Sequence, residues 1–246
     1  MRRARRALRV EGAAWVVLSV SSCLAAVAVT AGCARLGAPP SATSLALILD
    51  WQPALGLSEP WRLWTCAWVH GSVAHLLVNV VGGAVLAFVG WRARLPPASA
   101  IAWLLAWPGT QLLMVAIGSQ RLAAVMPHYF GLSGVLHAGV IVLGLSLAWP
   151  PKTHTHTHTH THTDTDTHTH TYTHTHTLAR PRRERWIGLA IVAGTVAKVA
   201  LEAPWTLAPH ADPALGIAVA PVAHACGIAA GLLAWTALRL ALRPVR

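Results

Sequence analysis

The chain has 246 residues, of which 54% are hydrophobic and only 11% are charged, with a formal net charge of +11. Soluble domains carry about 25% charged residues, so this composition excludes an ordinary soluble domain. The positive charge does not indicate nucleic-acid binding, because the arginines flank apolar blocks and form no surface interleaved with aromatic residues. We therefore expect a membrane protein that is surrounded by the lipid bilayer and has no nucleic-acid partner.

Six apolar segments approach the roughly 20 residues that a helix needs to cross a bilayer. They are long and continuously apolar, which favours helices over the strands of a barrel. The sequence predicts an all-α, six-helix membrane bundle over residues 13–240, between a basic N-terminal segment at 1–12 and a short tail at 241–246. The expected spans are 13–34, 73–91, 98–117, 132–149, 186–203 and 217–240.

Lys and Arg residues are distributed unevenly between the two sides of this bundle. With the N-terminus in the cytoplasm, 15 of the 19 fall in the N-terminal segment, the loops after the second and fourth spans, and the tail. The outer loops then hold three, and Lys198 lies within the fifth span. Because Lys and Arg accumulate in cytoplasmic loops, both termini are expected in the cytoplasm.

Two segments leave alternatives open. The first span could be a signal peptide, and its Thr30-Ala31-Gly32-Cys33 weakly resembles a lipoprotein cleavage site, but Thr30 stands where Leu is usual, so an uncleaved span is favoured. Residues 153–177 alternate Thr with His and include nine histidines, which could bind a divalent metal. Neither face of this alternation is apolar, so no strand is expected, and a disordered low-complexity cytoplasmic insert is favoured.

Polar residues within the apolar spans are functional candidates, because ionisable groups at membrane depth are costly. His75 and Asn79 are four residues apart and share a helix face near the outer end of the second span. Ser133 opens the fourth span with His137 one turn below it, and His224 lies about 10 Å into the sixth span. These three spans all run from outside to inside, so the polar groups are expected at a similar depth.

Ser133 and His224 suit nucleophilic catalysis, because a serine hydroxyl needs a neighbouring base to become a good nucleophile. The backbone N–H groups beside Ser133, with His75 and Asn79, are candidates for an oxyanion hole. No acidic residue accompanies His224 in its span, so a Ser-His dyad without a third member is expected. The GxxxG spacing of Gly227 and Gly231 would let the sixth span approach the fourth closely.

At these residues the sequence resembles the rhomboid family of intramembrane serine proteases. The resemblance covers about residues 61–235 without the insert, and its motifs stand in the family's order. It implies that Ser133 attacks the peptide carbonyl, that His224 is general base and then acid, and that an oxyanion hole forms around the new tetrahedral centre. The matching stretches are Trp61-Arg62-Leu63-Trp64-Thr65 with His70, His75 and Asn79; Gly131-Leu132-Ser133-Gly134; and Ala223-His224 with Gly227 and Gly231.

The same resemblance implies roles for the remaining motif residues. His75, Asn79 and the Ser133 backbone N–H would form the oxyanion hole, and His70 with the Trp61-Arg62 pair would shape the outer loop. Most family members have an aromatic residue, often tyrosine, where this chain has His137, which we expect to support His224.

Two further stretches are similar to the rhombosortase branch: Leu136-His137 and Lys198-Val199-Ala200-Leu201-Glu202. This branch trims C-terminal Gly-Gly-containing membrane anchors from exported bacterial proteins. The resemblance therefore implies a bacterial inner-membrane enzyme that acts on membrane-anchored proteins without metal or cofactor. Lys198 and Glu202, four residues apart, are expected to form an internal ion pair.

Other interpretations of the same residues remain. Ser133 could be a small helix-packing residue, and His75 and Asn79 could simply hydrogen-bond between helices. An alternative of another class is a catalytically inactive rhomboid-like protein that binds membrane helices as an escort. A transporter is disfavoured because the spans show no acidic relay and no paired broken helices.

Overall fold

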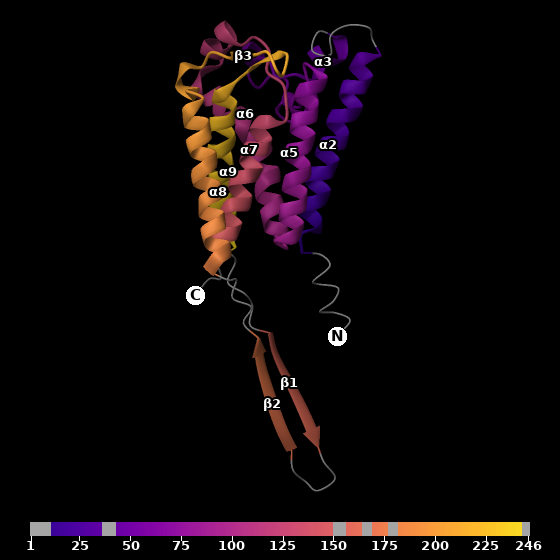
Figure 1. Cartoon of the computed structure of the whole chain (residues 1–246), viewed down its shortest axis with the longest axis vertical. Coiled ribbons are helices and arrows are strands. Elements are labelled where there is room, and N and C mark those ends of the chain that lie inside the picture. The colour runs from indigo at the N-terminus through magenta and orange to yellow at the C-terminus, as the bar shows by residue number, and fades with distance from the viewer. Residues whose placement is uncertain (1–10, 36–42, 150–155, 164–168, 177–181, 243–246) are drawn as a thin grey trace.

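The computed structural model describes residues 11–35, 43–149, 156–163, 169–176 and 182–242, and these are mostly helical. The long helices stand side by side in one bundle (Figure 1). The predicted helical architecture is thereby confirmed for the described part of the chain. In chain order the helices are α2 (Ala13–Ala34), α5 (Val73–Arg92), α6 (Pro97–Val125), α7 (Ser133–Ala148), α8 (Arg182–Leu201) and α9 (Pro221–Ala241).

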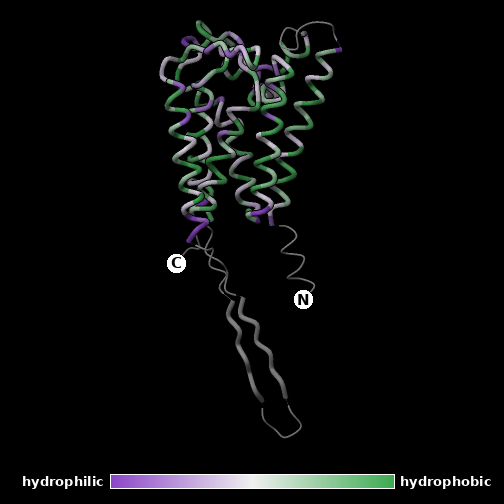
Figure 2. The backbone as a smooth tube through the Cα atoms, viewed as in Figure 1, coloured by the Kyte–Doolittle hydropathy of each residue, from purple (hydrophilic) through white to green (hydrophobic). Residues whose placement is uncertain are grey.

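Four of these helices, α2, α5, α6 and α9, are long and apolar enough to cross a membrane. Their outward side chains support the same conclusion, since Val17, Leu24, Val81 and Phe88 each expose about 60% or more of their surface. Figure 2 shows apolar residues along the length of the helices and hydrophilic ones gathered toward the ends. Soluble monomers rarely expose so much contiguous apolar surface, so the chain has the character of a membrane protein.

The centre of the bundle is α7, a shorter apolar helix of 16 residues. It packs against α9, α8, α6 and α5. Nearly every α7 residue is buried, and the exceptions are Ser133, His137 and Val140. These three are spaced i, i+4 and i+7, so they form one stripe along a single face of the helix. The fold therefore buries α7 on all sides except the face that carries Ser133.

Three helix boundaries differ from the predicted spans by more than three residues: the end of α6 and the starts of α8 and α9. Helix α6 reaches Val125 instead of the expected residue 117. Its backbone is kinked at Gly118, whose φ of 128° and ψ of 105° are not helical, and a second helical stretch follows the kink. Helix α8 begins at Arg182 instead of residue 186. Helix α9 begins at Pro221 instead of residue 217. The reason is that β4 (Ile217–Val219) pairs with β3 (His210–Asp212) in an antiparallel hairpin.

The segment between α2 and α5 covers the end of the bundle where α5 begins (Figure 1). It holds α3 (Ser44–Leu49), η2 (Pro53–Leu55), α4 (Arg62–Thr65) and η3 (Cys66–Trp68). The buried Arg62 ties this segment together. Its Nη1 donates to the carbonyls of Leu47 and Asp50 and lies 3.0 Å from the Asp50 carboxylate, which also lies 2.6 Å from His128 Nδ1.

The Thr-His segment forms a hairpin, which corrects the expectation that its alternation would not make strands. Strands β1 (His156–Thr163) and β2 (Thr169–His176) pair antiparallel, with Thr opposite Thr and most His opposite His. An apolar face is not required, because every second residue is a β-branched threonine and the paired backbones supply the hydrogen bonds. The rest of the 153–177 insert lies outside the described residues.

Helix α2 begins and α9 ends at the same end of the bundle, opposite the β3–β4 hairpin (Figure 1). Most of the predicted basic segment 1–12 and of the tail 241–246 lies outside the described residues, as do Lys152 and Arg180. The two ends of the bundle are therefore unlike. One carries the first and last helix termini, and the other carries the hairpin and the covering segment.

Candidate active site

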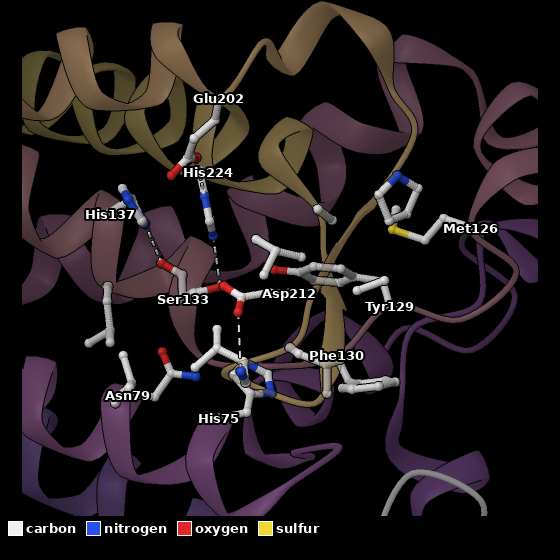
Figure 3. A pocket seen from close by; sticks show the side chains of 18 of the residues that line it. His75, Asn79, Met126, Tyr129, Phe130, Ser133, His137, Glu202, Asp212 and His224 are labelled. Carbon is white, nitrogen blue, oxygen red and sulfur yellow. Dashed lines mark hydrogen bonds and ion pairs between the residues drawn. The ribbon is translucent and has the colours of Figure 1, made fainter.

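A pocket of about 800 Å³ opens among α5, α7, α8 and α9. The wall of this pocket includes His75, Asn79, Ser133, His137 and His224, which come from three helices (Figure 3). The structure thus brings together the polar residues that the depth argument placed at one level. The other predicted site residues are not part of the pocket lining: Gly131, Gly134, Gly227, Gly231, His70 and Arg62.

Ser133 and His224 are hydrogen-bonded in the pocket. His224 Nε2 lies 3.0 Å from Ser133 Oγ, within the range of a nucleophile and its base. Ser133 is the first residue of α7 and His224 stands in the first turn of α9, so both side chains lie at helix N-termini. Backbone N–H groups at such termini have no partner inside the helix and favour negative charge nearby.

Glycines allow α9 to approach α7 this closely. A Cβ built on Gly227 would lie 2.0 Å from the carbonyl oxygen of Gly134, and one on Gly231 would lie 2.7 Å from that of Ala138. Both atoms belong to the α7 backbone, which cannot rotate away. The GxxxG spacing therefore has the packing role that the sequence predicts, and it sets the Ser133–His224 separation.

We predict that Gly227→Ala lowers stability by about 1–3 kcal/mol, because the added methyl overpacks the α7–α9 contact. A reaction that depends on the Ser133–His224 contact should slow by about 10²-fold, since a displacement of about 1 Å at a catalytic group costs this much. Thermal unfolding in detergent and the reaction rate measure the two effects. Gly32→Ala is the matched control, because its new Cβ meets Leu45 Cδ2 at an ordinary 3.4 Å. Equal behaviour of the two variants would contradict the packing role.

His224 has an acidic neighbour, which corrects the expectation of an isolated dyad. His224 Nδ1 lies 2.7 Å from Oε2 of Glu202, the residue directly after α8. Ser133, His224 and Glu202 therefore stand in a row, as in a nucleophile, base and carboxylate arrangement (Figure 3). The acidic partner of His224 comes from the end of α8, outside the span that carries His224.

Lys198 and His137 complete the surroundings of His224. The predicted ion pair is present, with Lys198 Nζ 2.6 Å from Glu202 Oε1. Lys198 Nζ also lies 3.1 Å from His137 Nε2, and His137 Nδ1 lies 2.7 Å from the carbonyl oxygen of Ser133. The His137 ring stacks on that of His224 at 4.2 Å between centroids and an angle of 20°. His137 thus supports His224 in the way the sequence predicts.

The α5 wall of the pocket carries His75 and Asn79, both almost fully buried. Ser72 caps α5 by accepting a hydrogen bond from the His75 backbone N–H, which fixes the first turn. Asn79 Nδ2 lies 3.0 Å from His70 Nε2. Figure 3 shows Asn79 and His75 on the opposite side of Ser133 from His224. That placement suits groups that contact the carbonyl oxygen of a bound peptide.

His70 orients Asn79 from behind the pocket. Burial lowers the pKa of His70 to about 4, so the ring is neutral at physiological pH. Its Nδ1 lies 3.3 Å from the carbonyl oxygen of Trp68 and donates to it, which leaves Nε2 to accept from the Asn79 amide. The sequence suggested a loop-shaping role for His70, and the structure adds this contact.

Gly131 is needed for its backbone and for its lack of a side chain. Its φ is 116°, a region that residues with a Cβ rarely adopt. A Cβ there would also lie 2.6 Å from His75 Cε1. Gly134 leaves room in the same way, since a Cβ on it would lie 2.8 Å from the Tyr129 hydroxyl. The Gly-Leu-Ser-Gly sequence therefore brings the start of α7 against α5 and α9.

No protein-family model and no curated protein matches this sequence. Among the residues whose side chains the structure describes, no group of three or more His, Cys, Asp or Glu is placed to hold a metal ion.

Asp212 is a further pocket residue that sequence reasoning missed. Its Oδ1 accepts hydrogen bonds from the backbone N–H groups of Ala214 and Leu215, which closes the turn between β3 and β4. The Ser72 hydroxyl in turn donates to the Leu215 carbonyl and ties the hairpin to the start of α5. The hairpin residue Ile217 also lines the pocket. No motif marked Asp212, because its place depends on the pairing of β3 with β4, and β4 falls inside the predicted sixth span.

Proposed function

We propose that the chain is an intramembrane serine endopeptidase of the rhomboid type, in which Ser133 is the nucleophile and His224 the base. The observation that carries the proposal is the 3.0 Å contact between Ser133 Oγ and His224 Nε2, inside a pocket walled by membrane-type helices. The motifs around both residues support it, because they resemble that family in order and spacing. The same two residues exposed on the surface of a soluble protein would be much weaker support for catalysis.

The first half of the reaction forms an acyl-enzyme. His224 Nε2 accepts the Ser133 hydroxyl proton as Oγ attacks the peptide carbonyl. Negative charge then develops on the carbonyl oxygen, where Asn79, His75 and the Ser133 backbone N–H would donate hydrogen bonds. Protonated His224 next gives its proton to the leaving amine, and the carbon–nitrogen bond breaks.

The second half releases the product. Water enters the pocket and loses a proton to His224 Nε2 as its oxygen attacks the acyl carbon. The same donors hold the second oxyanion, and the Ser133–acyl bond breaks with return of the proton to Oγ. Polar side chains such as Asn79 and Glu202 line this pocket together with the apolar Val78, Leu136 and Val140.

The proposed topology has six spans, with α7 and α8 crossing beside the four helices that are long and apolar enough to span a membrane. Both termini would face the cytoplasm of a bacterial inner membrane, and the pocket would open toward the outer face. The distribution of Lys and Arg supports this orientation, as does the placement of the first and last helix termini opposite the hairpin. A substrate would then be a membrane-anchored protein whose scissile bond lies outside or near the outer leaflet.

The proposed substrates are exported proteins with a C-terminal anchor that contains Gly-Gly. A transmembrane helix hides its carbonyls in internal hydrogen bonds, so a protease must first unwind it. Each glycine lowers the cost of unwinding by about 1 kcal/mol relative to alanine. Glycine also lets the peptide backbone approach Ser133 without a side chain in the way.

A reporter with a Gly-Gly-containing C-terminal anchor tests this proposal. We expect the purified chain in liposomes to release the reporter, and replacing both glycines with leucine to slow release by about 10-fold or more, as the two unwinding terms combine. Release is followed by gel mobility and mass spectrometry of the new C-terminus. Equal cleavage of the leucine version, or a preference for N-terminal anchors, would contradict the Gly-Gly specificity and leave a general rhomboid protease. No cleavage of any anchor would favour an escort that binds membrane helices.

A further inference from the structure

The carboxylate of Glu202 uses its two oxygens for two different partners. Oε2 lies 2.7 Å from His224 Nδ1, and Oε1 lies 2.6 Å from Lys198 Nζ. An i,i+4 ion pair on a helix surface would need only the second contact, and would contribute little. The first contact comes from a residue 22 positions further along the chain, on another helix. Glu202 therefore joins the end of α8 to the base of the proposed reaction.

The hydrogen bonds at this point form a closed ring. They run from the Ser133 hydroxyl to His224, Glu202, Lys198 and His137, and return to the Ser133 carbonyl oxygen. Each group in the ring can donate a hydrogen bond to the next group or accept one from it. His137 donates through Nδ1 to the Ser133 carbonyl, so its Nε2 is free to accept from the Lys198 ammonium. Figure 3 shows Glu202, His224 and Ser133 in sequence across the pocket.

We propose that Glu202 is a positioning residue that holds His224 in the tautomer with hydrogen on Nδ1, and that Lys198 fixes the orientation of the carboxylate. This inference rests on the proposed function. An acceptor at Nδ1 keeps the hydrogen there and leaves the Nε2 lone pair facing Ser133 Oγ. The carboxylate also stabilises the imidazolium that forms when His224 takes the serine proton. The site then works as Ser133, His224 and Glu202 together.

The test compares Glu202→Gln with Glu202→Asp in the full-length chain. Glutamine keeps the shape but loses the charge, while aspartate keeps the charge on a shorter side chain. Converting a buried triad aspartate to its amide costs about 10⁴-fold in kcat. The Glu202 side chain is 26% exposed, so water weakens its interaction with His224. We therefore expect Glu202→Gln to lower kcat by a smaller factor, about 10²–10³. KM should be nearly unchanged, and Glu202→Asp should retain more activity than Glu202→Gln.

Lys198 makes a sharper form of this test possible. In Glu202→Gln the ammonium of Lys198 will bind the amide oxygen, which turns the amide NH₂ toward His224 Nδ1 and selects the wrong tautomer. Adding Lys198→Met frees the amide to rotate and present its oxygen to Nδ1. The double variant should therefore be more active than Glu202→Gln alone, by about 10-fold. Two independent defects would instead make the double variant worse.

Glu11→Gln is the matched control, because Glu11 is exposed and stands just before α2, which begins at the opposite end of the bundle from the hairpin. Nitrogen-15 NMR of the histidines, with His224 assigned by its loss in His224→Gln, gives a readout that needs no activity. We expect the Nδ1–H tautomer in the unaltered chain and a shift toward Nε2–H in Glu202→Gln. A chain that cleaves normally with Glu202→Gln, or an unchanged tautomer, overturns the role of Glu202. If the unaltered chain cleaves nothing but the tautomer depends on Glu202, the positioning role stands and the proposed protease function fails.

Discussion

Replacing Ser133 with alanine, or His224 with alanine, is expected to reduce cleavage by about 10⁶-fold, the loss seen when a serine protease loses its nucleophile or its base. The physical reason is that each residue is useless without the other. A hydroxyl without a base is a weak nucleophile, and a base without the hydroxyl has no acyl acceptor. The double variant should therefore be no worse than either single variant.

The measurement is release of an anchored reporter by purified chain in liposomes. Ser21→Ala is the matched control, because Ser21 is an exposed serine of α2 whose hydroxyl bonds to the Leu18 carbonyl of its own helix. All variants should unfold within a few degrees of the unaltered chain. Substantial cleavage by Ser133→Ala would show that another group is the nucleophile.

The second large effect concerns the carbonyl oxygen of the substrate. Asn79→Ala and His75→Ala should each lower kcat by about 10²–10³-fold, because one donor to the developing oxyanion is lost. KM should change little, since these hydrogen bonds strengthen as charge develops in the transition state. Asn79 has the firmer case, because His70 Nε2 holds its amide in place at 3.0 Å.

Asn79→Asp separates the donor role from a packing role. It keeps the shape of the side chain but replaces the NH₂ donor with a carboxylate oxygen. We expect it to be at least as damaging as Asn79→Ala, because a negative charge beside the oxyanion is repulsive. If Asn79→Asp keeps full turnover while Asn79→Ala loses stability, Asn79 only ties helices together.

Much of the site was accessible from the sequence because membrane depth can be counted in residues. Ser133, His75, Asn79 and His224 lie within the first turns of helices that were predicted to run the same way. Helix α2 begins and ends at the predicted residues, since its apolar run has clear polar flanks. Counting along a helix thus predicted which side chains could share one pocket.

The contact between Glu202 and His224 was not predicted from the sequence. The spacing of Glu202 from Lys198 was visible, but an i,i+4 pair satisfies both charges and gives no reason to seek a third partner. Glu202 lies at the outer end of the predicted fifth span, on the same side of the membrane as Ser133 and His224. The position of Asp212 in the pocket could not be predicted, because the apolar residues Ile217–Val219 give no sequence signal for the β4 strand.

The prediction for the Thr-His segment was wrong for a different reason. An alternating pattern needs an apolar face only where the strand packs on a core. A two-stranded ribbon outside the bundle has no core to face. There the β-branched threonines and the antiparallel pairing of β1 with β2 suffice.

Labelling with a serine-reactive fluorophosphonate tests the central claim most directly, because it reports an activated serine without any assumption about the substrate. The reagent is added to the unaltered chain in detergent or liposomes, and the modified peptide is identified by mass spectrometry. We expect a single adduct on Ser133 that disappears in His224→Ala, although Ser133 is still present in that variant. Labelling that persists unchanged in His224→Ala, or no labelling of Ser133 in the unaltered chain, would contradict a serine protease activated by His224.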